Sequence, residues 1–229
     1  MLTRTAIRGF PASQTRNWPP EPRAAGQGLA GSLALIGACM PFGRNAEIYA
    51  EDEPADYVYK VISGAVRTYK LLSDGRRQIG AFHLPGDVFG LEAGKEHHFS
   101  AEAIADSKVL VVKRSAITAL AVRDSEIARE LWALTALYLE RAQNHMLLLG
   151  RKNAQERLAA FLLEMATRIP SGNIIALPMC RQDIADYLGL TIETVSRTLT
   201  QLESTAAIDL PSSRRILLRD RAALNQLNS

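Results

Sequence analysis

The stretch CRQDIADYLGLTIETVSRTLTQLE, residues 180–203, contains two short amphipathic segments separated by a glycine. Each segment has one apolar helical face: Ile184, Ala185 and Leu188 in the first, and Val195, Leu199 and Leu202 in the second. Gly189 stands where a tight turn needs a positive φ, and Thr191 is a suitable N-cap for a second helix from Ile192 to about Leu202. Two short helices joined by a glycine-containing turn predict a helix-turn-helix.

The second predicted helix has an outward face with the chemistry of major-groove readout. A carboxylate such as Glu193 accepts from cytosine N4, and a guanidinium such as Arg197 bonds guanine O6 and N7. Ser196 suits a base edge or a phosphate, and Ile192 suits a thymine methyl. In an arbitrary helix, Glu193 and Arg197 would be a surface i,i+4 pair worth about 0.2–0.5 kcal/mol. Inside a helix-turn-helix we predict that all four side chains contact bases.

A β-hairpin is expected directly after this motif, in AAIDLPSSRRILLRD, residues 206–220. Short strands at Ile208–Leu210 and Ile216–Leu218 flank the turn Pro211–Arg215. Such a wing places Ser and Arg beside the DNA backbone, where contacts add affinity but no sequence information; one or both arginines could instead be merely solvated. The predicted phosphate contacts are Arg181, Thr191, Thr194, Ser212, Ser213 and Arg214.

The rest of the chain indicates an α+β protein. Residues 1–29 are rich in Pro, Gly, Ser and Arg and are expected to be a flexible tail, with a short helix around residues 28–40. Short Val-, Ile- and Tyr-rich segments with turn signals between them predict an antiparallel β-roll over residues 30–122. The last part, residues 151–229, is expected to be the winged helix-turn-helix domain.

A long helix is expected over residues 123–150, with two apolar stripes. One stripe suffices to pack a helix on its own domain, so the second predicts another partner. A helix buried on two sides within one chain is the alternative. We predict a homodimer interface formed by Trp132, Thr135, Leu139, Ala142, Met146 and Leu149.

These motifs, with GRRQIGAFHLPGDVFG at residues 75–90 and IETVSR at residues 192–197, resemble the CRP/FNR family of bacterial transcription regulators, and within it the FixK-type activators. The resemblance covers roughly residues 30–225 and implies a cyclic-nucleotide-binding-like jelly roll, a central dimerisation helix and a winged helix. Ser196 with an apolar residue at 192 is similar to the FNR/FixK subgroup. It implies a homodimer that binds double-stranded DNA at a TTGA…TCAA inverted repeat, contacts RNA polymerase and activates low-oxygen genes, including those of respiration and nitrogen fixation.

The family's usual effectors are not expected. An iron–sulfur cluster needs about four thiolates, and the first 179 residues contain only Cys39. Cyclic-AMP binders use Arg-Ser in the turn of the roll, whereas the corresponding residues 90–103 have Glu92 and Ser100 but no arginine. His97 and His98 are interpreted as a solvated pair without partners at metal-ligand spacing. We therefore predict no cofactor, no metal and no cyclic nucleotide.

Cys180 is then the remaining candidate for a sensor. It is predicted as the N-cap of the first helix, with Asp183 at N3, where family members commonly have Thr or Ser. A helix N-terminus beside Arg181 favours a reactive thiolate. The resemblance places this helix end close to a DNA phosphate, so an oxidised, anionic Cys180 would weaken binding. A buried, inert cysteine is the alternative, and the two readings stay level.

Composition narrows the function classes further. Residues 31–150 carry 13 basic and 15 acidic side chains, and residues 151–229 carry 10 and 8, which permits nucleic-acid binding at the C-terminal end. No apolar run approaches the roughly 18 residues of a membrane span, and two distant cysteines fit a reducing cytoplasm. The sequence contains no nucleophile–base pair and no phosphate-binding glycine loop, so we do not expect an enzyme. A small-molecule-binding β-roll with an effector-dependent regulatory role remains the second hypothesis.

Overall fold

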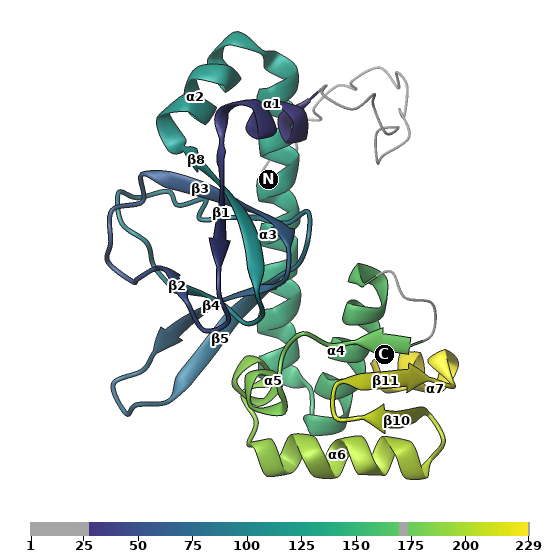
Figure 1. Ribbon diagram of the computed structural model, residues 1–229. Helices are drawn as coiled ribbons and strands as arrows, with labels where there is room; N and C mark the ends of the chain where they lie inside the picture. The colour runs from purple at the N-terminus through teal and green to yellow at the C-terminus, as the bar shows by residue number, and fades with distance from the viewer. Residues whose placement is uncertain (1–27, 170–173, 229) are drawn as a thin grey trace, which may run out of the picture.

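The computed structural model describes residues 28–169 and 174–228, and it has three parts along the chain (Figure 1). The first is a β-roll of two antiparallel sheets, the second a long helix along one side of the roll, and the third a smaller α/β domain at the end of that helix. This is the predicted α+β fold. All but two residues of the predicted tail, 1–29, lie outside the described residues.

The β-roll is formed by two four-stranded sheets, ordered β1-β8-β3-β6 and β2-β7-β4-β5. All strand pairs of the two sheets are antiparallel, and the β3–β8 and β4–β5 ladders are the most extensive. The strands are β1 (Ala38–Phe42), β2 (Glu47–Tyr49), β3 (Tyr57–Ser63), β4 (Val66–Leu71), β5 (Arg77–His83), β6 (Val88–Phe89), β7 (Ser100–Ala103) and β8 (Ser107–Lys113).

Buried side chains between the two sheets explain why the segments rich in Val, Ile and Tyr form this roll. Val61, Val66 and Val109 are fully buried there together with the ring of Tyr49. Burying such side chains contributes roughly 1.5–3 kcal/mol each relative to leaving them in water. A second cluster joins the roll to α1 (Leu29–Ile36), α2 (Arg114–Arg123) and the long helix.

In this region one local expectation is confirmed over a shorter range, and another is wrong. The helix expected around residues 28–40 ends at Ile36, because the chain enters β1 at Ala38 and pairs with β8. Only one of the two histidines expected to be solvated is in contact with solvent. His98 is exposed, but His97 is completely buried and stacks on Tyr49 with ring centroids 3.6 Å apart. Adjacent residues on an extended segment point to opposite sides, so one ring enters the roll.

The long helix α3 (Ser125–Arg151) begins at the N-cap Asp124, whose carboxylate accepts from the backbone N–H of Glu126 at 2.8 Å. Its two apolar stripes differ in their surroundings. The first packs on the chain's own roll through buried or half-buried side chains, namely Ile127, Leu131, Leu134 and Tyr138. The second is largely exposed: Trp132, Thr135, Leu139, Ala142 and Met146 are open to solvent, and Leu149 is half-buried.

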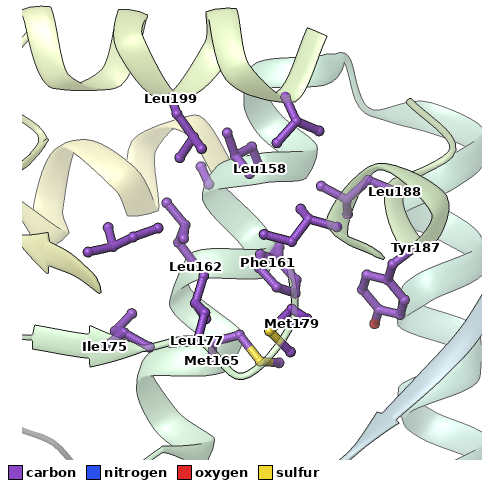
Figure 2. Close-up of a cluster of buried hydrophobic side chains, with 14 of the residues drawn as sticks. Leu158, Phe161, Leu162, Met165, Ile175, Leu177, Met179, Tyr187, Leu188 and Leu199 are labelled. Atoms are coloured by element: carbon purple, nitrogen blue, oxygen red, sulfur yellow. The ribbon is translucent and has the colours of Figure 1, made fainter. Parts of the chain in front are cut away.

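The C-terminal domain packs helices against a three-stranded sheet with the order β10-β11-β9. Its elements are α4 (Ala154–Arg168), β9 (Ile174–Ala176), α5 (Arg181–Leu188), α6 (Ile192–Ser204), β10 (Ile208–Ser212), β11 (Arg215–Leu218) and α7 (Arg221–Asn228). Figure 2 shows its core, in which Phe161, Leu162 and Met165 of α4 meet Ile175 and Leu199. The helix-turn-helix is therefore built on α4 as its scaffold.

Candidate nucleic-acid interface

Helices α5 and α6 form the predicted helix-turn-helix. Gly189 ends α5 in the left-handed conformation, with φ 61° and ψ 39°, which glycine adopts without the strain of a side chain. The Thr191 hydroxyl caps α6 by accepting from the Thr194 N–H at 3.2 Å. The apolar faces predicted from the sequence point inward, and each of their six side chains is at most 3% exposed: Ile184, Ala185, Leu188, Val195, Leu199 and Leu202.

The opposite face of α6 carries the residues predicted to read bases. Glu193 and Arg197 are exposed, Ile192 is 38% exposed, and Ser196 is half-buried. Among the described residues, no ion pair within 4 Å involves Glu193 or Arg197. Hydrogen bonds from its own backbone and from Thr191 lower the pKa of Glu193, which keeps this carboxylate an acceptor. The face thus presents a carboxylate and a guanidinium four residues apart, and neither enters an ion pair within residues 28–169 and 174–228.

The residues predicted to contact phosphates lie in three places: at the start of α5, at the start of α6 and in the hairpin between β10 and β11. Arg181, at the start of α5, donates from Nη1 to the Ser196 hydroxyl at 3.2 Å, so one of these residues borders the outward face of α6. Thr194 is half-buried beside the exposed Thr191, and their hydroxyl oxygens are 3.0 Å apart.

The wing is a real hairpin, but its turn is tighter than expected. Ser212 belongs to β10 and pairs with Arg215 of β11, so that the turn consists of Ser213 and Arg214 alone. Ser212 and Ser213 are exposed, whereas Arg214 is half-buried and its carbonyl accepts from the Leu177 N–H at 2.8 Å.

Cys180 occupies the predicted N-cap of α5, and its surroundings differ from the expected ones. Its thiol donates to Oδ2 of Asp183 at 3.1 Å, and its backbone N–H donates to the same oxygen at 3.1 Å. The side chain of Arg181 turns away toward Ser196. The half-buried thiol is therefore hydrogen-bonded to a carboxylate instead of facing a guanidinium.

A cavity of about 410 Å³ lies between the roll, α3 and the C-terminal domain, and it was not expected from any sequence motif. Two arginines line it, but both already pair with Asp87: Arg168 at 2.8 Å and Arg141 at 3.3 Å. Burial lowers the pKa of His83, another lining residue, to about 4. The remaining walls are mainly aromatic and aliphatic, including Phe82, Phe89, Phe99, Tyr138 and Tyr187.

Neither a metal-binding cluster nor a membrane-spanning helix is found in the part of the chain that the structure describes. No group of three or more His, Cys, Asp or Glu side chains is placed to hold a metal ion. Within residues 28–169 and 174–228, no helix has both the length and the apolar character that a bilayer span requires.

The arrangement defines a class: a DNA-binding transcription regulator with a β-roll joined by a long helix to a winged helix-turn-helix. Family models agree, since residues 40–124 match a cyclic nucleotide-binding domain and residues 156–227 match a Crp-like helix-turn-helix domain.

Individual relatives narrow the class. The chain is 55% identical over 202 residues to the nitrogen fixation regulation protein FixK of Azorhizobium caulinodans, covering 86% of this chain and 82% of that protein. It is 49% identical over 181 residues to the FixK of Rhizobium meliloti, covering 79% and 82%. The solved structure of FixK2 from Bradyrhizobium japonicum is 56% identical, with a TM-score of 0.82 and coverage of 85% and 98%. The chain belongs to the CRP/FNR family, whose named members here are transcription regulators and not enzymes.

Proposed function

We propose that the protein is a homodimeric, sequence-specific activator that binds a TTGA…TCAA-type inverted repeat and recruits RNA polymerase to low-oxygen genes, including those of respiration and nitrogen fixation. The observation that carries the proposal is the outward face of α6, with Glu193 and Arg197 exposed and unpaired within the described chain. The names of the relatives support the gene class, because the two FixK proteins reported above are nitrogen fixation regulation proteins.

Dimerisation through α3 is supported by the exposed apolar stripe. Trp132, Leu139 and Met146 are 76%, 59% and 64% exposed, and they recur at intervals of seven residues. Seven-residue spacing keeps apolar side chains on one seam of a helix, which is the pattern of a two-stranded coiled coil. A second copy of α3 related by a two-fold axis would cover this seam.

DNA contacts follow from this arrangement. Ile192, Glu193, Ser196 and Arg197 would read base edges, with Arg197 on guanine. Phosphates would be contacted by Arg181, Thr191, Thr194, Ser212, Ser213 and Arg214. Since Arg181 already bonds Ser196, its phosphate contact would also orient a base-reading hydroxyl.

Activity without a cyclic nucleotide or an iron–sulfur cluster is part of the proposal. A cyclic phosphate needs a cation in the pocket, and both arginines that line the cavity are paired with Asp87. Isothermal titration with cAMP and with cGMP tests this point. We expect no heat of binding at micromolar concentrations, and micromolar affinity for either would favour the second hypothesis, an effector-dependent β-roll, which the cavity itself supports.

Oxidation of Cys180 is the proposed means of inactivation. Conversion of the thiol to a sulfinic or sulfonic acid by peroxide would place a second negative charge beside the Asp183 carboxylate, at the end of a helix that is expected to face phosphate. Binding would then weaken on every DNA sequence alike, because the repelled groups are phosphates.

One experiment tests both sequence-specific DNA binding and its loss on oxidation of Cys180. Fluorescence anisotropy with a TTGA…TCAA duplex is measured for the parent protein and Cys180→Ser, before and after peroxide. The proposal expects specific binding by both proteins, lost after peroxide only in the parent. Equal loss in Cys180→Ser, or unchanged binding by the parent, contradicts the redox part; absence of binding to the untreated duplex contradicts DNA reading.

A further inference from the structure

A cluster of ion pairs joins the β-roll to the first helix of the helix-turn-helix. Arg67 of β4 donates from Nη1 to Oδ1 of Asp183 at 2.6 Å, and Arg77 of β5 donates from Nη2 to the same oxygen at 2.9 Å. Arg77 also donates from Nε to Asp186 at 2.8 Å, and Arg67 from Nη2 to Glu102 of β7 at 2.8 Å. Figure 1 shows α5 between the ends of β4 and β5 and helix α6.

These contacts are buried, so water screens them little. The side chains of Arg67 and Asp183 are 9% and 5% exposed, and Arg77 and Asp186 are 22% and 13% exposed. Removing one partner of such a pair leaves a charge that is both unpaired and poorly hydrated, which is strongly unfavourable. A break in the cluster would therefore drive the remaining carboxylates on α5 toward water and away from the roll.

The cluster is one of several contacts between the roll and the C-terminal domain, which also include the packing of Phe82 against Phe161 and Tyr187. At the junction of α3 and α4, the Arg157 guanidinium donates to the carbonyls of Lys152, Leu188 and Leu149, each at 2.8 Å. At the other end of α4, Arg168 donates to the Phe82 carbonyl of β5 at 2.6 Å. A domain held only at the α3–α4 junction could rotate, whereas further contacts at α4 and at α5 fix its orientation.

We infer that Arg67 and Arg77 are positioning residues that hold the DNA-reading domain in one preset orientation on the β-roll without touching DNA. The inference rests on the proposed function and deepens it, because it explains how α6 is held ready without a bound effector. A fixed orientation removes the loss of affinity that a protein suffers when only a fraction of its molecules is binding-competent.

The test uses the full-length protein and matched variants. Asp186→Asn removes the Arg77–Asp186 ion pair, Arg77→Met removes this pair and the Arg77–Asp183 pair, and the double variant completes a cycle for the pair that both share. Arg76→Met is the control, since Arg76 is the neighbouring residue, is exposed, and pairs with Asp74 within its own hairpin at 2.7 Å. Urea unfolding first establishes that each variant is folded.

The first readout is hydrogen–deuterium exchange in the absence of DNA. We expect amide exchange in α5 and around Lys152 to accelerate by about tenfold or more in Arg77→Met, as expected when a buried pair is broken, and to stay at the parent rate in Arg76→Met. The double variant should exchange no faster than Arg77→Met, because the Arg77–Asp186 interaction is already lost in that variant. Equal exchange in Arg77→Met and its control, or additive effects in the cycle, overturns the inference.

The second readout separates positioning from DNA contact. With the TTGA…TCAA duplex, Arg77→Met should lose about tenfold in affinity while the slope of log K against log salt stays unchanged. A slope reduced by about 1 would show that Arg77 contacts a phosphate and would overturn the positioning role. If the parent protein fails to bind the duplex, the proposed function fails, and the exchange comparison alone still decides whether the arginines hold the domain.

Discussion

The two helices of the helix-turn-helix differ in what their polar side chains contact. On α5, Asp183 and Asp186 are largely buried and paired with arginines of the β-roll. On α6, Glu193 and Arg197 are exposed and, within the described residues, enter no ion pair. Charged groups that are satisfied inside the chain hold the fold together, whereas charged groups left open on a rigid helix are available to another molecule. The contrast supports the two proposals, attachment through α5 and DNA recognition through α6.

The largest expected effect comes from the core that both helices share. Leu199→Ala removes a side chain that is 2% exposed, and we expect it to lower the free energy of unfolding of the C-terminal domain by about 2–5 kcal/mol. Thr200→Ala, on the exposed side of the same helix, should stay within about 0.5 kcal/mol of the parent. Urea denaturation followed by circular dichroism measures both. Similar losses for the two variants would break the distinction between the inner and outer faces.

A second prediction concerns the pH dependence of stability and His83, a buried side chain of β5, the strand whose Arg77 holds α5. Burial lowers the pKa of His83 to about 4, while Asp87 acts in the opposite direction. An unfolded chain takes up a proton near pH 6.5 and the folded chain does not, so stability should fall as the pH drops from 6.5 to 4. The loss for this group is about 3 kcal/mol.

The variant His83→Gln checks whether His83 causes this loss of stability at low pH. Its stability should fall less steeply over the same pH range, although His97 and His145, whose pKa values are also lowered by burial, keep part of the slope. Urea midpoints at pH 7, 6, 5 and 4 provide the measurement. Identical pH profiles for parent and variant would rule out His83 as a contributor.

The smallest effect is expected at the start of the recognition helix. Thr191→Ala removes the hydroxyl that accepts from the Thr194 N–H, and the loss of such an N-cap costs about 1 kcal/mol. Thr191→Ser, which keeps the hydroxyl, should retain the parent's stability. A thermal unfolding curve for Thr191→Ala that superimposes on that of the parent would mean that the cap does not stabilise α6.

Local patterns in the sequence predicted the recognition helix well. The spacing of Val195, Leu199 and Leu202 defined its buried face, Gly189 marked the turn, and Thr191 marked the start. Each of these signals lies within about two turns of helix or within one tight turn, so residues close in sequence determine it. The side chains left on the outer face followed from the same periodicity.

The attachment of α5 could not be predicted, because its partners are distant in sequence. Arg67 and Asp183 are 116 residues apart, and nothing near either residue indicates the other. The same reason explains Cys180: its position as N-cap was readable, but its contact with a carboxylate depended on where Asp183 is directed. His97 was misjudged because burial of one histidine depends on the packing of the roll around Tyr49.

Equilibrium binding of the parent protein and Arg197→Ala tests most directly whether α6 reads DNA. Each is titrated with the TTGA…TCAA duplex and with duplexes in which the guanine of each half-site is replaced. We predict that Arg197→Ala weakens binding to the parent duplex by about 1–3 kcal/mol and loses discrimination at that guanine, while its binding to random DNA is unchanged. An equal loss of affinity on random DNA would contradict base readout by Arg197 and would assign this arginine to the phosphate backbone.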